Sequence, residues 1–174
     1  MRVRGFEVVK RLEGKESEII LPKRSTKNAA GYDFFTYEDI VIPSSIVPDF
    51  LNFGRNVLTG EYKFELGRVK PTLIPTGVKA YMKDDEVLVL ANRSSNPKKL
   101  GLILANGVGI IDSDYYGNPD NDGEIMFAYF NIFPIPIKIS KGSKIGQGIF
   151  QNFLFTDDDK PSGNREGGFG STGN

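Results

Sequence analysis

The residues most able to perform chemistry gather between Asn106 and Gly117, where the sequence reads NGVGIIDSDYYG. Glycines and apolar residues lead directly into Asp112 and Asp114, so we expect a β-hairpin that carries both carboxylates at one end. Residues two apart on a strand point to the same side, which makes one carboxylate a candidate general base and the other its orienting neighbour. A solvated turn with ordinary aspartates explains this segment equally well when it is taken alone.

A second group lies near the C-terminus, where Arg165 precedes GGFGSTG. Successive glycines allow backbone N–H groups to converge on an anion, and an arginine can contact a phosphate through two hydrogen bonds. Phe169 is the one aromatic residue of this run and could stack on a base. No Gly-Lys-Ser/Thr sequence follows, so the segment is not a Walker A loop. The alternative is a flexible tail without a binding role.

Smaller signals lie between these two groups. Arg93, Ser94 and Ser95 follow an apolar segment and place a guanidinium beside two hydroxyls, a set suited to phosphoryl oxygens. Gln147 belongs to GSKIGQ, which predicts a tight turn into a strand, and Asp33 follows the glycine of AAGYD. Each has an ordinary structural interpretation when taken alone.

Composition excludes much of the catalytic repertoire. The 174 residues contain no histidine and no cysteine, which removes Ser-His-Asp triads, thiolate nucleophiles and zinc sites built on these residues. The 22 basic and 22 acidic residues balance, so neither nucleic acid nor an anionic membrane is an expected partner. No apolar run is long enough for a signal peptide or a membrane span. We therefore expect a cytoplasmic protein, in the host cytoplasm if the gene is viral or from a phage.

Strand signals dominate the chain, because its apolar segments are short, rich in Val, Ile and aromatic residues, and punctuated by Gly, Pro, Asn or Asp. These segments are FEVVKRL, EIILP, DIVIP, PTLIPTGVKAYM, EVLVLAN, LGLILANGVGIID, EIMFAYFNIF and IPIKIS. Their spacing predicts an all-β sandwich or jelly-roll over residues 1–155. Residues 156–174 are expected to form a mobile, Gly-rich arm. Residues 44–68 and 118–123 interrupt the pattern as insertions.

Five segments, taken in order, resemble the five motifs of the homotrimeric dUTPase family. They are AAGYDFF, RSS, NGVGIIDSDYYG, GSKIGQGIF and REGGFGSTG. LPKRSTKNAAGYD and LIPTGV are also similar to family sequence, so the resemblance covers most of the chain except the two insertions and the extreme N-terminus. It implies a distorted jelly-roll β-barrel that assembles as a trimer, with active sites at subunit interfaces and each site closed by a C-terminal arm.

The resemblance also implies an activity, the hydrolysis of dUTP to dUMP and pyrophosphate by Mg²⁺-assisted attack of water on the α-phosphorus. By position, Asp112 corresponds to the residue that activates this water. Mg²⁺ would be held mainly by phosphate oxygens and waters, in keeping with its preference for oxygen ligands and retained hydration. Asp33 would bond to one of those waters.

Substrate contacts follow from the same resemblance. Asn106 and the backbone of Gly109, Ile110 and Ile111 would read the edge of uracil, and Tyr115 would pack beneath the deoxyribose and exclude a 2′-hydroxyl. The positions that match phosphate or arm contacts are Arg93, Ser94, Ser95, Gln147, Arg165, Phe169, Gly170, Ser171 and Thr172.

Two departures and two alternatives accompany this interpretation. Arg165 stands one residue nearer to its glycine pair than in the usual family pattern, and the 118–123 insertion directly follows the third motif, at the rim of the expected uracil pocket. One alternative is a dCTP deaminase, or a bifunctional enzyme, of the same fold. The other is a regulatory protein that binds a partner protein through residues 44–68, with hydrolysis secondary.

Overall fold

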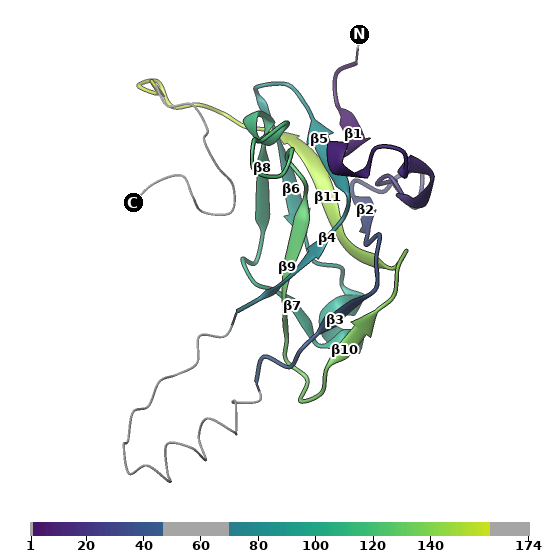
Figure 1. Ribbon diagram of the computed structural model, residues 1–174. Coiled ribbons are helices and arrows are strands. Elements are labelled where there is room, and N and C mark those ends of the chain that lie inside the picture. The colour runs from purple at the N-terminus through teal and green to yellow at the C-terminus, as the bar shows by residue number, and fades with distance from the viewer. Residues whose placement is uncertain (1, 47–69, 161–174) are drawn as a thin grey trace, which may run out of the picture.

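Short apolar segments separated by glycine, proline and polar residues form strands in the computed structural model, which describes residues 2–46 and 70–160 (Figure 1). The strands are β1 (Gly5–Val8), β2 (Tyr32–Phe35), β3 (Ile40–Ile42), β4 (Thr72–Pro75), β5 (Val78–Tyr81), β6 (Glu86–Ala91), β7 (Leu102–Leu104), β8 (Gly109–Asp112), β9 (Met126–Asn131), β10 (Ile137–Ile139) and β11 (Lys144–Asn152). Helical structure in these ranges is limited to 3₁₀ turns at Lys10–Leu12, Glu16–Glu18 and Ser113–Tyr115, and a π-type turn at Asn96–Leu100. The prediction of an all-β fold is confirmed.

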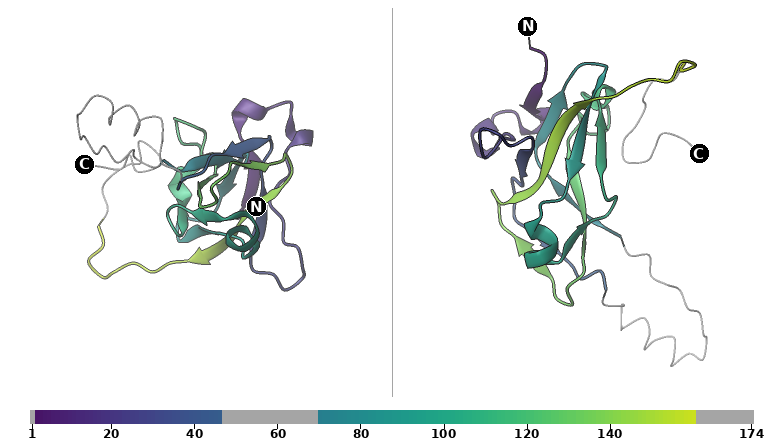
Figure 2. Two further views of the ribbon diagram at one scale, coloured as in Figure 1. Left: turned by 90° about the horizontal axis from the view of Figure 1, so that it is seen from below. Right: turned by 180° about the vertical axis from the view of Figure 1, so that it is seen from behind.

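Two antiparallel sheets form the two main layers of the described chain. One has the strand order β2-β11-β6-β8, and the other has the order β4-β9-β7. The pairs β1-β5 and β10-β3 form two small sheets, which lie toward opposite ends of the molecule (Figures 1 and 2). The segment from β7 to β8 passes from the edge of one main layer to the edge of the other. Its strands pair with β9 and β6 and not with each other, so the name β7–β8 hairpin serves only as a label for this segment. Both of its strands are therefore the last strands of their sheets.

The core lies between the two main layers because their strands alternate buried and less buried residues. In β6, Leu88 and Leu90 are buried, and in β9 Phe127 and Tyr129 are buried. The rings of Phe34 and Phe127 meet across the layers with centroids 5.5 Å apart. The side chains between these buried positions face outward from the sandwich.

Gly146 on β11 is required by the packing of this core. A Cβ atom at this position would overlap the ring of Phe127, which is 1% exposed. We expect Gly146→Ala to lower the free energy of unfolding by about 1–3 kcal/mol, as overpacking of a tight core does. Urea denaturation measures this as a lower midpoint at unchanged slope. Gln151→Ala, at an exposed position of the same strand, is the control, and equal stability of the two variants would contradict the close contact.

Three predicted strands differ from the structure. LGLILANGVGIID forms β7 and β8, which belong to different sheets, so the β-hairpin predicted to carry the carboxylates does not form as a pair of strands. The segment EIILP forms no strand, because Glu16–Glu18 makes a 3₁₀ turn and Ile19 reaches the core from irregular chain. The run PTLIPTGVKAYM forms β4 and β5 rather than one strand, and these belong to different sheets. The chain turns at Gly77, whose φ of 71° lies in the left-handed region that glycine adopts easily. Residues 118–123 form turns, as predicted.

Several predictions concern residues outside the described ranges. The predicted insertion at 44–68 falls almost entirely within residues 47–69, and the predicted arm contacts Arg165, Phe169, Gly170, Ser171 and Thr172 fall within residues 161–174. In the ranges that are described, no helix has the length and apolar character needed to cross a membrane.

Candidate active site

A cavity of about 720 Å³ opens between the two main layers beside the β7–β8 hairpin. One wall comes from Leu90 and Ile111 of the first sheet, and the opposite wall comes from Phe127 and Ala128 of β9. The cavity brings together residues predicted to bind the base and the sugar, which are Asn106, Gly109, Ile110, Ile111 and Tyr115. An apolar cavity with a few polar groups at one side is the usual form of a small-molecule site.

The backbone of β8 is available at one edge of this cavity. β8 pairs with β6 and is the terminal strand of its sheet, so the N–H and C=O groups of its other edge have no strand partner in the described chain. Asn106 lies on the exposed turn that enters β8, next to Gly107, whose φ is 69°. This arrangement can present a row of backbone donors and acceptors to a flat heterocycle.

The two aspartates of the hairpin do not lie on one strand, which corrects the sequence-based prediction. Asp112 is the last residue of β8 and is exposed, whereas Asp114 belongs to the following 3₁₀ turn. The strand ends because Ser113–Tyr115 turns the chain so that Tyr115 enters the core. The alternation argument for paired carboxylates therefore fails, and Asp112 alone keeps a strand-defined direction.

Tyr115 lines the cavity near the hairpin. Its side chain is 4% exposed, and its hydroxyl receives a hydrogen bond of 2.8 Å from Asn121 Nδ2. The hydroxyl also donates to the carbonyl of Glu124 at 3.3 Å. A buried tyrosine hydroxyl needs such partners, and here they fix the far end of the ring.

A second group of predicted residues gathers where β2 and β11 pair. Asp33 and Gln147 are register partners, and Asp33 Oδ2 accepts hydrogen bonds from Lys144 Nζ at 2.6 Å and from Ser25 Oγ at 2.5 Å. Burial raises the pKa of the Asp33 carboxyl, but these two hydrogen bonds, together with the positive charges of Lys144 and Arg93, hold the pKa below its ordinary value. Asp33 is thus a carboxylate at neutral pH.

Gly31 gives Gln147 its place in this group. A Cβ on Gly31 would come within 2.9 Å of Gln147 Oε1, so the absent side chain leaves room for the amide. Gln147 Nε2 also donates to the carbonyl of Asn92, at 3.4 Å, just before the segment that carries Arg93. Three of the motif segments therefore meet at one end of the first sheet.

A buried network of polar side chains holds the chain on either side of the Arg93–Ser95 segment. The sequence analysis did not predict this network. Asn96 is 1% exposed, and its Nδ2 donates to Asn92 Oδ1 at 2.9 Å and to the Ile145 carbonyl at 2.7 Å. The Tyr129 hydroxyl lies 2.7 Å from the same carbonyl, and burial raises the pKa of Tyr129 to about 12. The guanidinium of Arg93 donates to the Lys144 carbonyl at 3.0 Å. Asn92 and Asn96, which flank RSS, were the only available signal, and asparagine is equally common in loops.

The two groups of predicted residues lie far apart in space within one folded chain. On the outer face of the first sheet, Asp112 is the partner of Val87 and Gln147 is the partner of Ala91. Four residues along β6 correspond to about 13 Å, and two strand spacings of about 4.8 Å separate β8 from β11, so the two Cα atoms are roughly 16 Å apart. Apolar side chains occupy the surface between them, and one of these, Ile110, is 55% exposed.

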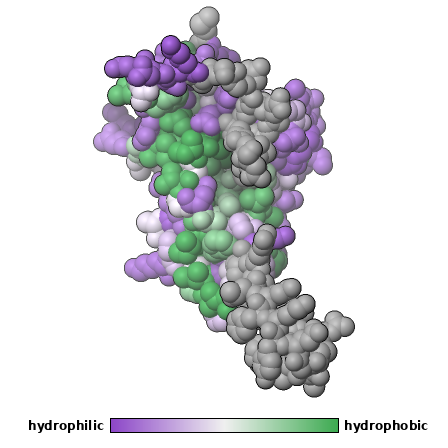
Figure 3. Space-filling view, turned by 90° about the vertical axis from the view of Figure 1, so that its left-hand side faces the viewer, coloured by the Kyte–Doolittle hydropathy of each residue, from purple (hydrophilic) through white to green (hydrophobic). Residues whose placement is uncertain are grey.

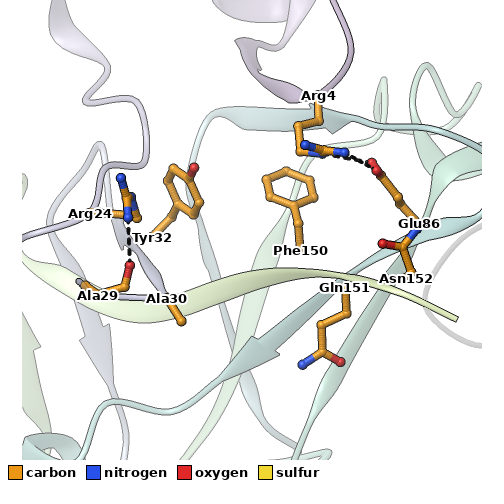
Figure 4. A pocket seen from close by; sticks show the side chains of 9 residues that line it. All are labelled: Arg4, Arg24, Ala29, Ala30, Tyr32, Glu86, Phe150, Gln151 and Asn152. Carbon is orange, nitrogen blue, oxygen red and sulfur yellow. Dashed lines mark hydrogen bonds and ion pairs between the residues drawn. The ribbon is translucent and has the colours of Figure 1, made fainter. Parts of the chain in front are cut away.

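A further cavity of about 340 Å³ lies near the start of the chain and holds none of the predicted site residues (Figure 4). Arg4 reaches over the ring of Phe150 to form an ion pair with Glu86, which is 2% exposed. Arg24 donates to the carbonyls of Lys27 and Ala29 at 3.0 and 3.1 Å. Both guanidinium groups are thus held by the chain itself.

Comparisons with known proteins identify relatives of the whole chain. The family model described as dUTPase matches residues 58–173. A curated protein from Lactococcus lactis named deoxyuridine 5′-triphosphate nucleotidohydrolase is 43% identical over 175 residues, covering 99% of both chains. A protein of the same name from Haemophilus influenzae is 30% identical, covering 90% of this chain and 89% of its own. The crystal structure of a dUTPase from Streptococcus mutans superposes with a TM-score of 0.69 at 38% identity, over 88% of this chain and 98% of that one.

Proposed function

The chain belongs to the dUTPase family, and from this premise we propose how its residues hydrolyse dUTP to dUMP and pyrophosphate. Its nearly all-β structure matches the jelly-roll fold of this family, which confirms the predicted fold class. The observation that supports the mechanism most directly is the cavity beside β8, whose lining contains the residues proposed to hold the nucleoside. Asp112 directly follows one of them, Ile111, at the end of β8.

Uracil would bind against the open edge of β8. The backbone of Gly109, Ile110 and Ile111 and the side chain of Asn106 would pair with the donors and acceptors of the base. Cytosine presents a donor where uracil has an acceptor at position 4, so its binding would leave groups of the hairpin unpaired. Such mismatches discriminate strongly between otherwise similar substrates.

Tyr115 would select the sugar. Its ring lines the cavity and is held at its hydroxyl end, so it offers a fixed surface beneath the deoxyribose. A 2′-hydroxyl would require the ring to move, which disfavours UTP.

Asp112 would act as the general base. It ends β8 directly after Ile111, which lines the cavity, and its carboxylate can accept a proton from a water molecule that attacks the α-phosphorus. The chain contains no histidine, so a carboxylate is the natural base for this step. Most of the rate enhancement would come from holding the water and the triphosphate in line and from neutralising charge on the leaving pyrophosphate.

The triphosphate would bind to the group at the end of β2, β6 and β11. Arg93, Ser94, Ser95 and Gln147 supply cationic and neutral donors there, and Lys144 adds an ammonium group. The arm residues Arg165, Phe169, Gly170, Ser171 and Thr172 would then cover the base and the γ-phosphate. These arm contacts are proposed on their positions in the fifth motif.

Mg²⁺ fits this donor set as a cofactor carried chiefly by the substrate. Within residues 2–46 and 70–160 no three acidic side chains group together as a protein metal site would require. Mg²⁺ commonly keeps several waters and takes few carboxylates together with substrate phosphates. Asp33 Oδ2 is engaged by Lys144 and Ser25, so Oδ1 is the atom that would contact a metal-bound water. The bound ion would supply positive charge to the triphosphate.

We further propose that each active site is shared between copies of the chain in a trimer. Within one copy, a triphosphate reaching from Asp112 to Gln147 would lie across apolar side chains, where charged oxygens find no donors. Apolar side chains also gather on the side of the molecule that carries β8 (Figure 3). Leu73 and Ile110, which line the cavity, are 43% and 55% exposed, and Val108, which directly precedes β8, is 50% exposed. A neighbouring copy can cover this surface and bring its own Arg93 and Gln147 to the hairpin. Cytoplasmic location and a partner protein at residues 44–68 stay predictions.

A pyrophosphate-release assay tests the proposed substrate. We expect release from dUTP and little from UTP, dCTP or dTTP at equal concentration, because the hairpin reads the base and Tyr115 limits the sugar. Release from all four nucleotides at similar rates would contradict the assignment of the hairpin. Conversion of dCTP to a uracil nucleotide in the same assay would instead indicate a deaminase.

A further inference from the structure

The 118–123 loop, Asn118–Gly123, packs directly against the tyrosine to which the proposed function assigns sugar selection. Asn121 Nδ2 donates to the Tyr115 hydroxyl at 2.8 Å, and Asn121 Oδ1 accepts from the backbone of Gly123 at 3.1 Å. A side chain at Gly123 would collide with the Tyr115 carbonyl. The loop that interrupts the sequence pattern is therefore in close contact with the wall of the nucleoside cavity.

We propose that Asn121 is a positioning residue which acts through Tyr115 and sets the discrimination between dUTP and UTP. The proposal rests on the proposed function of Tyr115. The Tyr115 hydroxyl accepts a hydrogen bond from Asn121 and donates one to the Glu124 carbonyl. The donor from Asn121 comes from a side chain and can be removed without altering the ring or the backbone of the cavity.

The loop has its own attachment to the rest of the fold. Asp122 Oδ2 accepts from Lys79 Nζ of β5 at 2.7 Å and from the backbone N–H of Lys10 at 2.8 Å. Lys79 is 5% exposed, and its ammonium also lies 4.7 Å from the centre of the Tyr116 ring. In Figure 1 the segment between β8 and β9 accordingly curls at the end of the molecule that carries β1 and β5.

The backbone of Asp122 indicates that this attachment is specific. Its φ of 59° makes it the one non-glycine residue of the described chain in the left-handed region. A residue keeps such a conformation when the surrounding contacts determine it. The chain of contacts from Lys79 through Asp122 and Asn121 thus ends at the Tyr115 ring.

A small displacement of this ring is sufficient to change sugar selection. UTP differs from dUTP by one hydroxyl group, and a pocket excludes it only while the wall facing carbon 2′ stays fixed. Without the donor from Asn121, the hydroxyl end of Tyr115 loses one of its anchors, so the ring can tilt and admit the additional oxygen. The effect falls on the choice of sugar rather than on the chemical step, which involves Asp112.

The test measures kcat/KM for dUTP and for UTP in a double-mutant cycle. We expect Asn121→Ala to lower the dUTP/UTP ratio by about tenfold, the scale on which one small group changes the selectivity of a pocket. Tyr115→Phe removes the hydroxyl and with it both hydrogen bonds, so it should lower the ratio at least as much. The double variant should fall no further than Tyr115→Phe alone, because that change already removes the interaction with Asn121.

Two further variants make the result decisive. Asp120→Asn alters an exposed side chain of the same loop and should leave the ratio unchanged. Asp122→Asn keeps a residue that tolerates the left-handed region but removes the charge facing Lys79, and it should lower the ratio even if Asn121→Ala fails to fold. An unchanged ratio in Asn121→Ala and Asp122→Asn, or multiplicative losses in the double variant, would overturn the proposal. A parent protein that hydrolyses dUTP and UTP equally would overturn the proposed function instead.

Discussion

Asp112→Asn is expected to lower kcat/KM for dUTP by about 10²- to 10⁴-fold, which is the contribution of a general base. Asparagine keeps the size of the side chain at the end of β8, so the hairpin and the cavity beside it should persist. It cannot accept a proton at neutral pH, and the attacking water would lose its base. Pyrophosphate release under steady-state conditions measures the loss, and an equilibrium binding measurement with a non-hydrolysable dUTP analogue should give an affinity close to that of the parent.

Asp114→Asn is the matched control, because it makes the same chemical change two residues further along the chain. Asp114 belongs to the 3₁₀ turn rather than to β8, so it lacks the strand-defined position of Asp112. We expect this variant to retain activity near that of the parent protein. Equal losses in both variants would mean that the segment needs its charge or its fold, and the assignment of Asp112 as the base would be wrong.

Mixed assemblies of two inactive variants are expected to recover activity. Arg93→Ala removes a guanidinium from the proposed phosphate group and should cost about 10²-fold in kcat, the scale seen when a donor to developing charge is lost. Asp112→Asn removes the base. If Asp112 comes from one copy and Arg93 from another, an assembly containing both variants can form sites in which both residues are intact.

The composition of the trimers sets the size of this recovery. In every trimer that contains both variants, one of the three sites combines an intact Asp112 with an intact Arg93, so about one third of the sites in mixed assemblies should be active. The variants should be refolded together and purified through two different tags, so that only mixed assemblies are assayed. The double variant Asp112→Asn/Arg93→Ala mixed with Asp112→Asn is the control and should stay inactive. No recovery in verified mixed assemblies would place both residues of each site in one chain.

Local sequence was sufficient to predict the secondary structure where turn chemistry and hydrophobic pattern agree. Strands β6, β8, β9 and β11 were all predicted, because apolar residues alternate between glycine-containing turns. The prediction of a strand at EIILP was wrong, because the composition of the segment favours a strand but no neighbouring strand pairs with it in the described chain. Pairing is a non-local property, and composition alone does not report it.

The candidate site was predictable only in part. Asn106, Asp112 and Tyr115 occupy a dense and unusual motif. Asn106 and Tyr115 line one cavity in the structure, and Asp112 lies at the end of β8, directly after Ile111 of the same lining. Lys144 and Asn96 carry no comparable signal, because single lysines and asparagines are common in turns. Their contacts with Asp33 and Tyr129 join positions more than thirty residues apart, as the separations of 111 and 33 residues show.

The sequence by itself determined the chemistry available to this protein: carboxylates, arginine, glycine-rich turns and no imidazole or thiol, arranged in five segments in family order. The tertiary structure decided which of these groups meet. Strand order in the first sheet puts Asp33 beside Gln147 but leaves Asp112 roughly 16 Å from that pair. The 118–123 loop interrupts the strand pattern of the sequence, and in the folded chain its Asn121 side chain donates a hydrogen bond to the Tyr115 hydroxyl. Side-chain types are fixed residue by residue, whereas distances between remote segments depend on how the whole chain packs.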